Sequence, residues 1–206
     1  MEVAMARKPA PDTRACILDV ASRLFYERGV HAVGLQQVID EYGCGKNLLY
    51  REFPSKDELV VAWLEQCRKN WSDKITAITA PLADDPAGQL IAIVRAVADD
   101  VAEPGFRGCA LRNTHAEFPD RDHPAHRVSV EYVKDIRSLL LDLAKRARAH
   151  DPETLADRIM LIIDGLLVNG AVLGRRGAAG AAVAFAEEVV RDATRGRTRT
   201  KAARPA

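Results

Sequence analysis

Residues 34–53 read GLQQVIDEYGCGKNLLYREF, and this stretch decides the fold of the chain. Its apolar residues recur at helical spacing on both sides of Gly43, as Leu35, Val38, Ile39 and Tyr42 before it and as Leu48, Leu49 and Phe53 after it. The pattern predicts two short helices joined by a glycine-bearing turn, which is the layout of a helix-turn-helix. In such a unit the second helix lies in the major groove of DNA, and the first helix braces it across the backbone.

The second predicted helix carries side chains that suit bases or phosphates. They are Lys46, Asn47, Tyr50 and Arg51. All four can donate hydrogen bonds, and such donors either fix a protein on the phosphate backbone or read base edges. We therefore interpret residues 12–53 as a three-helix head that binds double-stranded DNA.

Three pieces of sequence around this unit stand in a fixed order. Residues 13–21 (TRACILDVA) and 24–29 (LFYERG) precede it, residues 49–53 (LYREF) lie within it, and residues 54–59 (PSKDEL) follow it. Together they resemble the TetR family of bacterial transcriptional regulators. The resemblance covers residues 13–59, and the remaining chain matches only loosely, as it does in a family whose C-terminal part varies with the ligand.

The resemblance implies an all-α fold of about nine helices and a homodimer formed through the last two of them. It further implies a repressor that leaves a palindromic operator when a small apolar ligand binds, and not an enzyme. The DNA-binding positions that it implies here are Gln36, Gln37, Gly45, Lys46, Asn47, Leu48, Tyr50, Arg51 and Lys56. By analogy and by position, we expect Tyr50 and Lys56 to hold phosphates. The base edges are then left to Gln36, Lys46, Asn47 and Arg51.

The sequence departs from the family pattern at four positions. Thr or Ser is usual where Val33 and Gly34 stand, so the first helix of the motif loses a side-chain N-cap worth about 1 kcal/mol. Thr is usual at Leu48, and His at Glu52. A carboxylate near phosphates is repulsive, so we expect that Glu52 either forms an ion pair or weakens non-specific DNA binding.

The composition describes an ordinary soluble protein with one or two helical domains. The chain has 206 residues, 48% of them hydrophobic and 29% charged, and a net charge of only +1. No global basic field attracts DNA, so binding must come from a local face. Four cysteines without CxxC pairing, and the lack of an apolar signal segment, favour a reducing cytoplasm.

The body is predicted from helix start signals. We expect a mobile arm over residues 1–11, the head over 12–53, a ligand-binding and dimerisation body over 54–195, and a basic disordered tail over 196–206. Caps are predicted at Asp12, Ser55 with Glu58, Asp85 before Pro86, and Asp151 before Pro152. The helix that starts after Pro54 connects head to body, so a tilt of its far end would swing the head.

The eighth predicted helix is apolar nearly all round from residue 159 to 173. This run is shorter than the roughly 20 residues of a membrane span and contains Asp164 and Asn169, so we expect no membrane segment. Such a helix needs partners on several sides. We expect its outer side, together with the ninth helix, to contact a second subunit, with Leu166 and Val190 in that interface.

A ligand pocket is predicted between the fourth, fifth, seventh and eighth helices. Its expected residues are Trp63, Arg95, Val97, Asn113, His115, Tyr132, Ile136 and Asn169. The polar members stand on otherwise apolar helices, and a few such groups orient a ligand in a pocket. As hydrogen-bonded core residues they would look the same in the sequence.

The sequence gives only weak signals for a metal site, a reactive thiol or a catalytic site. Residues 115–126 contain three His and three acidic residues, but Pro119 and Pro124 divide them, and Asp122 or His123 is better used as a helix cap. We therefore expect no metal and no cofactor. Cys109 suits a buried apolar residue better than a thiol sensor, and so does Cys44 at the turn of the DNA motif. No catalytic constellation is present, and the alternative function is a helical small-molecule-binding protein with weak or lost DNA binding.

Overall fold

The computed structural model describes residues 13–174 and 176–195. Within these ranges the chain forms nine α-helices, one 3-10 helix and no strand, which confirms the predicted all-α fold. The helices are α1 (Thr13–Arg28), α2 (Leu35–Tyr42), α3 (Lys46–Glu52), α4 (Lys56–Thr79), η1 (Ala80–Leu82), α5 (Pro86–Val101), α6 (Ala110–Glu117), α7 (Pro124–Arg146), α8 (Pro152–Leu173) and α9 (Ala178–Thr194). The predicted arm, the basic tail and the Asp12 cap lie outside the described residues.

The described residues form two compact units. The first contains the residues up to Trp71 together with Cys109–Tyr132, and the second contains Ser72–Gly108 and the residues from Val133 onward. Both α4 and α7 contribute residues to each unit. The predicted division between the head and the body after residue 53 stays a prediction.

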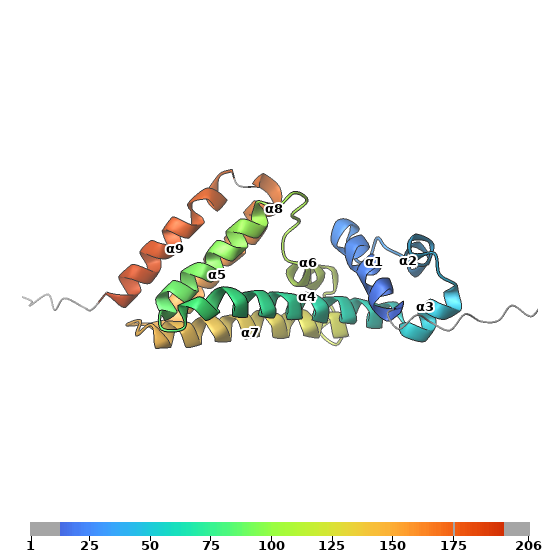
Figure 1. Cartoon of the computed structure of the whole chain (residues 1–206), viewed down its shortest axis with the longest axis horizontal. Coiled ribbons are helices and arrows are strands. Elements are labelled where there is room, and N and C mark those ends of the chain that lie inside the picture. Colours follow the sequence, from blue (N-terminus) through green and yellow to red (C-terminus); the bar gives the residue numbers. More distant parts are fainter. Residues whose placement is uncertain (1–12, 175, 196–206) are drawn as a thin grey trace, which may run out of the picture. The chain divides into compact units, whose positions relative to one another are not determined.

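Helices α1, α2 and α3 form a three-helix group in the first unit, because α1 packs against both α2 and α3 (Figure 1). Their apolar faces make the core: Ile17, Ala21, Leu24, Phe25, Val38, Ile39, Leu49 and Phe53 are all buried. Gly29 after α1 and Gly43 after α2 have φ of 86° and 72°. This left-handed conformation favours glycine, and it produces the two turns that set α2 against α1 and α3.

Helix starts follow the predicted caps. The Ser55 hydroxyl accepts from the backbone N–H of Glu58 at 3.1 Å, and the Asp85 carboxylate accepts from that of Gly88 at 2.8 Å. Asp151 accepts from the backbone N–H of Thr154 at 3.1 Å. These bonds satisfy N–H groups that the first turn of a helix cannot pair internally.

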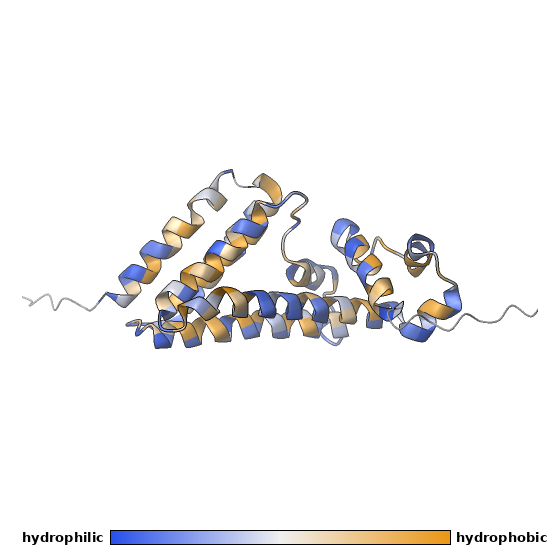
Figure 2. Ribbon diagram, in the orientation of Figure 1, coloured by the Kyte–Doolittle hydropathy of each residue, from blue (hydrophilic) through white to orange (hydrophobic). Residues whose placement is uncertain are grey.

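In the second unit, α5, α8 and α9 pack against one another. Gly170 permits a close approach of α8 to α5, since a Cβ at this position would lie 2.5 Å from Cγ2 of Val101. Helix α7 alternates between hydrophobic and hydrophilic residues along its length, as expected of a helix with one buried side (Figure 2). None of the described helices is both long and apolar enough to cross a membrane.

Candidate nucleic-acid interface

Helix α3 presents its polar side outward because its apolar side is anchored. Leu49 is fully buried and Leu48 is half-buried. Lys46, Asn47, Tyr50 and Arg51 are all exposed, and 41% of the Tyr50 side chain is accessible. The structure therefore brings four of the predicted DNA-binding side chains together on one short helix.

The two glutamines of α2 are engaged locally. The Gln37 side chain accepts from the backbone N–H of Gly34 at 2.7 Å, and the Gln36 amide donates to the Asp40 carboxylate at 2.8 Å. Gln37 thus satisfies one helix-start N–H although Gly34 has no capping side chain. Gln36 remains exposed, and its bond to Asp40 must open before the amide can reach a base edge.

The turn before α3 is open at Gly45. A Cβ added at Gly45 would meet no atom within 4 Å, so the peptide ahead of Lys46 is open. The Lys46 ammonium lies 5.7 Å from the centroid of the Tyr50 ring, within the range of a cation–π interaction. Both side chains are predicted to contact DNA.

Glu52 forms an ion pair, which was one of its two expected arrangements. Its carboxylate lies 3.3 Å from Nε of Arg51. The carbonyl oxygen of Glu52 accepts a hydrogen bond from the Arg14 guanidinium, which also covers the Phe53 ring at 4.0 Å. The end of α3 is therefore fixed to α1 through Arg14, and Arg51 is held beside a carboxylate.

Lys56 lies in the first turn of α4 and is half-buried. Burial lowers its pKa from the ordinary value, while the carboxylates of Glu117 and Asp57 act in the opposite direction. The lysine predicted to hold a phosphate therefore stands in the field of two acidic side chains.

Glu117 at the end of α6 joins this region and was missed as a functional residue. Its carboxylate accepts from the backbone N–H groups of Val30 at 3.1 Å and His31 at 2.8 Å. The His31 ring is 2.8 Å from the Glu117 carbonyl oxygen and lies against Phe118, with ring centroids 4.7 Å apart. The turn between α1 and α2 is thus attached to α6 across 86 residues of sequence. No local pattern could have predicted this contact.

The histidines after α6 have structural partners. Nδ1 of His123 accepts from the backbone N–H of Ala125 at 3.2 Å, as proposed for a cap of α7, and Nε2 lies 3.4 Å from Asp57. His126 bonds to the Phe118 carbonyl oxygen at 2.8 Å, and its ring lies tilted against that of His115 with centroids 4.7 Å apart. In the described ranges no group of three or more His, Cys, Asp or Glu could hold a metal ion.

The predicted ligand-binding residues divide by exposure. Trp63, Val97, Tyr132 and Ile136 are buried, whereas Arg95, Asn113, His115 and Asn169 are exposed. Arg95 pairs with Glu187 at 3.2 Å, and the Asn169 amide donates to the Gly165 carbonyl at 3.0 Å. Trp63 and Tyr132 belong to the first unit, and Val97, Ile136 and Asn169 to the second. Their role in ligand binding stays a prediction.

Cys44 and Cys67 lie in environments that favour the thiol form. Burial raises the pKa of Cys44, and burial together with the nearby Cys109 raises the pKa of Cys67 to about 12. Burial is also the main cause of the raised pKa of Tyr132, which hydrogen-bonds Cys109. Because the thiolate is the reactive species, this favours a packing role for Cys44 and Cys67.

A helix-turn-helix with a buried inner face and an outer row of long donors defines a class, the helix-turn-helix DNA-binding proteins. Residues 17–63 match the family model of bacterial regulatory proteins of the tetR family. The transcriptional regulator LmrA of Bacillus subtilis is 33% identical over 164 residues, 79% of this chain and 86% of LmrA. The chain therefore belongs to the TetR family and is a DNA-binding transcriptional regulator.

Two further relatives show how similarity is distributed. SCO4454, a TetR-family regulator of Streptomyces coelicolor, superposes with a TM-score of 0.82 at 28% identity, covering 89% of this chain and 96% of its own. The transcriptional activator FasR of Mycolicibacterium smegmatis is 40% identical over 60 residues, only 29% of this chain and 27% of FasR. High identity can thus be confined to a short segment, while the fold likeness spans nearly the whole chain.

Proposed function

We propose that this regulator is a homodimeric repressor that holds a palindromic operator and leaves it when a small apolar ligand binds. The observation that carries the proposal is the exposed row of donors on α3, fixed by the fully buried Leu49. A helix anchored in this way can present Lys46, Asn47 and Arg51 to base edges in a major groove. Tyr50 and Lys56 would contact phosphates and set the register.

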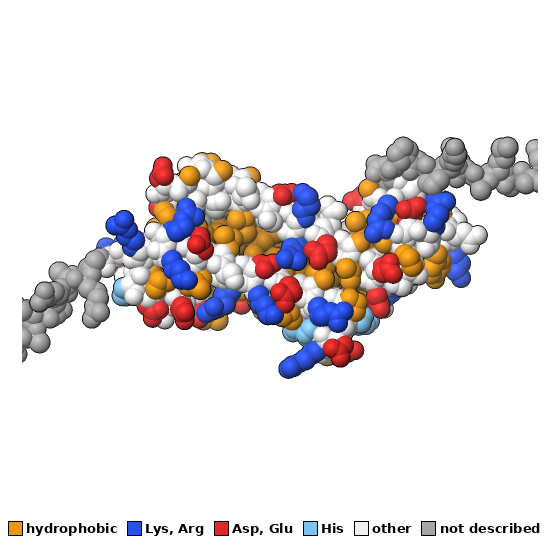
Figure 3. All heavy atoms as spheres, turned by 90° about the horizontal axis from the view of Figure 1, so that it is seen from below, with side chains coloured by type: hydrophobic (Ala, Val, Ile, Leu, Met, Phe, Trp, Pro, Cys, Tyr) orange, Lys and Arg blue, Asp and Glu red, His pale blue; other side chains and the backbone are white. Residues whose placement is uncertain are grey.

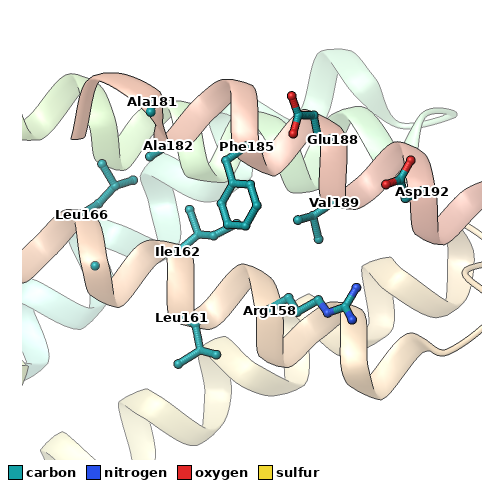
Figure 4. Close-up of a pocket in the computed structure, with 11 residues that line it drawn as sticks. Arg158, Leu161, Ile162, Leu166, Ala181, Ala182, Phe185, Glu188, Val189 and Asp192 are labelled. Carbon is teal, nitrogen blue, oxygen red and sulfur yellow. The ribbon is translucent and has the colours of Figure 1, made fainter. Parts of the chain in front are cut away.

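Dimerisation through α8 and α9 is supported by the apolar residues that one chain leaves exposed there. They are Leu161 (70% exposed), Val168 (66%), Val172 (78%), Leu173 (51%) and Phe185 (55%). A groove of about 650 Å³ runs between the two helices, where Ile162 and Phe185 point toward one another and Leu161 points away from α9 (Figure 4). Large exposed apolar side chains on two neighbouring helices are typical of a protein–protein interface, and a second copy of the chain would cover them.

A two-fold dimer implies a two-fold site on DNA. Two copies of α3 would enter successive major grooves roughly 34 Å apart or somewhat more, so the half-sites form an inverted repeat. The near-neutral charge of the chain is consistent with binding that depends on these specific contacts. On the face in Figure 3, Lys and Arg are interspersed with Asp and Glu rather than gathered in one broad area.

The ligand response is proposed to pass through α4, which contributes to both units. A small apolar ligand bound beside α4 would favour one arrangement of this helix. DNA is released if the DNA-bound arrangement binds this ligand less well. Reciprocity requires that operator DNA then weakens ligand binding by the same factor.

The test is a gel shift and footprint on DNA upstream of the regulator's own gene, at several salt concentrations in the cytoplasmic range. We expect protection of an inverted repeat, loss of binding in Arg51→Ala, and unchanged binding in Lys145→Ala, which removes an exposed cation from the end of α7. A promoter fusion gives the sign of regulation. Activation rather than repression would align the chain with FasR in this respect and would contradict the repressor.

The second candidate function is a helical small-molecule-binding protein whose head binds DNA weakly or not at all. The Arg51–Glu52 ion pair favours it, because it places a carboxylate beside a predicted base reader. Its signature is a ligand that binds equally well with and without DNA, together with the absence of any footprint at low salt.

A further inference from the structure

A second cavity, of about 460 Å³, opens between α1 and α4 within the first unit. It exists because α1 presents the small side chains of Ala15, Cys16 and Ser22 to α4. Helical spacing places Ala15 and Ser22 on one face with Cys16 beside it, and none of the three is long enough to fill the space in front of Trp63 and Asn70. The volume lies in the range of small-molecule sites.

The lining combines apolar and polar side chains. Its apolar members include Ala15, Leu18 and Trp63, of which Trp63 is only 4% exposed. The Ser22 hydroxyl donates to the Leu18 carbonyl at 2.6 Å, which leaves its oxygen available as an acceptor. The Gln66 amide donates to the Asn70 side-chain oxygen at 3.3 Å, which orients both amides at the mouth.

The charge of this lining has one sign. Asp19 on α1 contributes a carboxylate, and no Lys, Arg or His is among the described residues that line the cavity. A carboxylate beside apolar side chains attracts a cation with an apolar body and disfavours an anion. We propose that the cavity between α1 and α4 is a binding site for a small organic cation, whose charged group pairs with Asp19 and whose apolar body lies against Ala15 and Leu18.

This site shares Trp63 with the effector pocket predicted between the fourth, fifth, seventh and eighth helices, but its lining residues come from α1 and α4 alone. A ligand between α1 and α4 contacts the head directly. Helix α1 packs against α2 and α3, and Arg14 near its start bonds to the Glu52 carbonyl at the end of α3. A ligand bound in this cavity would therefore affect the position of α3. The consequence for DNA binding rests on the proposed function, whereas ligand binding itself can be tested without DNA.

The experiment uses the full chain without DNA and thioflavin T as the probe, an aromatic monocation whose fluorescence rises when it is immobilised. We expect saturable binding that Asp19→Asn weakens about fivefold, the size expected for an exposed ion pair. Ala15→Leu, at an exposed helical position, should weaken it by filling the cavity. Glu65→Gln is the matched control, because Glu65 is an exposed acid of α4 outside the cavity. It should leave the affinity unchanged.

A second measurement locates the probe. Cys16 is exposed and lines the cavity, so bound thioflavin T should slow its alkylation by a maleimide, read out by peptide mass spectrometry. Cys44 lies in the turn of the DNA motif and should alkylate at an unchanged rate. Binding that is equal in Asp19→Asn and the parent protein, alkylation of Cys16 that the probe does not slow, or no saturable binding at all would each overturn the proposal. None of these results depends on whether the protein binds an operator.

Discussion

Removing the Glu117 carboxylate should loosen the turn between α1 and α2. The carboxylate accepts two backbone hydrogen bonds, a partly buried one from Val30 at 3.1 Å and an exposed one from His31 at 2.8 Å. A hydrogen bond to a charged group contributes about 1.5 to 3 kcal/mol, with exposed bonds at or below the lower limit. We therefore expect Glu117→Ala to lower the free energy of unfolding by about 2 kcal/mol. Glu117→Gln keeps one acceptor oxygen, and about half of this loss is expected.

The magnitude converts into a measurable shift. For a chain of this size, 1 kcal/mol corresponds to about 2 to 4 °C in Tm, so Glu117→Ala should lower the Tm by about 4 to 8 °C in a circular dichroism melt. Glu103→Ala is the control, because Glu103 is exposed beyond the end of α5. It should change the free energy by less than about 0.5 kcal/mol.

Hydrogen exchange tests the cause of this shift. The amide hydrogens of Val30 and His31 should exchange faster in Glu117→Ala, because local opening then breaks no bond to the carboxylate. The reasoning is refuted if these two amides exchange as slowly as in the parent protein, or if Glu117→Ala melts together with the Glu103→Ala control.

Three further predictions concern the DNA face and the dimer. Lys46→Ala should relax the sequence preference at particular base pairs by about 1 to 3 kcal/mol. Lys56→Ala should weaken binding to all DNA sequences alike and flatten the salt dependence by about one unit per subunit. The reverse pattern in quantitative gel shifts would exchange the two roles. Phe185→Glu should give monomers in analytical ultracentrifugation, since it buries a charge in the proposed interface, and a stable dimer would point to another surface. Glu52→Gln should tighten non-specific binding only about twofold, because the carboxylate is already paired with Arg51 and exposed pairs are weak; a tenfold gain would mean that Glu52 faces the DNA backbone.

The helices were predictable because their signals are local. Caps such as Ser55, Asp85 and Asp151 precede apolar periodicity within a few residues, and glycines with positive φ end α1 and α2. The head was predictable for the same reason, since each piece of the motif is contiguous. The compensation for the missing cap at Gly34 is also local. Gln37 stands three residues later, as in a capping box, and its side chain accepts from the backbone N–H of Gly34.

The sequence did not predict which side of each apolar helix packs inside its own chain and which side stays exposed. The sequence shows that α8 is apolar nearly all round, but periodicity does not say which side packs within its own chain. We expected Leu166 and Val190 in the subunit interface, whereas each is 2% exposed within one chain, between α8 and its neighbours. The large apolar residues that α8 and α9 leave exposed are Leu161, Val168, Val172, Leu173 and Phe185. A charge at Leu166 would therefore test the core of one chain rather than the dimer.

Contacts between segments that are distant in the sequence were not predictable either. Glu117 was considered in the sequence only as a member of an acidic and histidine-rich segment, yet its carboxylate bonds the head and its field acts on Lys56. Nothing near residue 117 encodes Val30 or His31, which are brought to it by the fold. The partners of the candidate effector residues were equally unpredictable. Arg95 pairs with Glu187, and the Asn169 amide donates to the Gly165 carbonyl, both on the surface of one chain.

The Arg51–Glu52 pair connects these contacts to specificity. Arg51 can read a base only after its guanidinium leaves the carboxylate, and a correct base can replace that bond with two hydrogen bonds of its own. A phosphate also replaces it, but it brings a second negative charge toward Glu52, so the exchange is less favourable on non-specific DNA. Arg14, bonded to the Glu52 carbonyl, keeps that residue in place while Arg51 moves. The acidic residue in the DNA-binding helix would thus lower non-specific affinity more than specific affinity, which gives discrimination to a chain whose net charge is only +1.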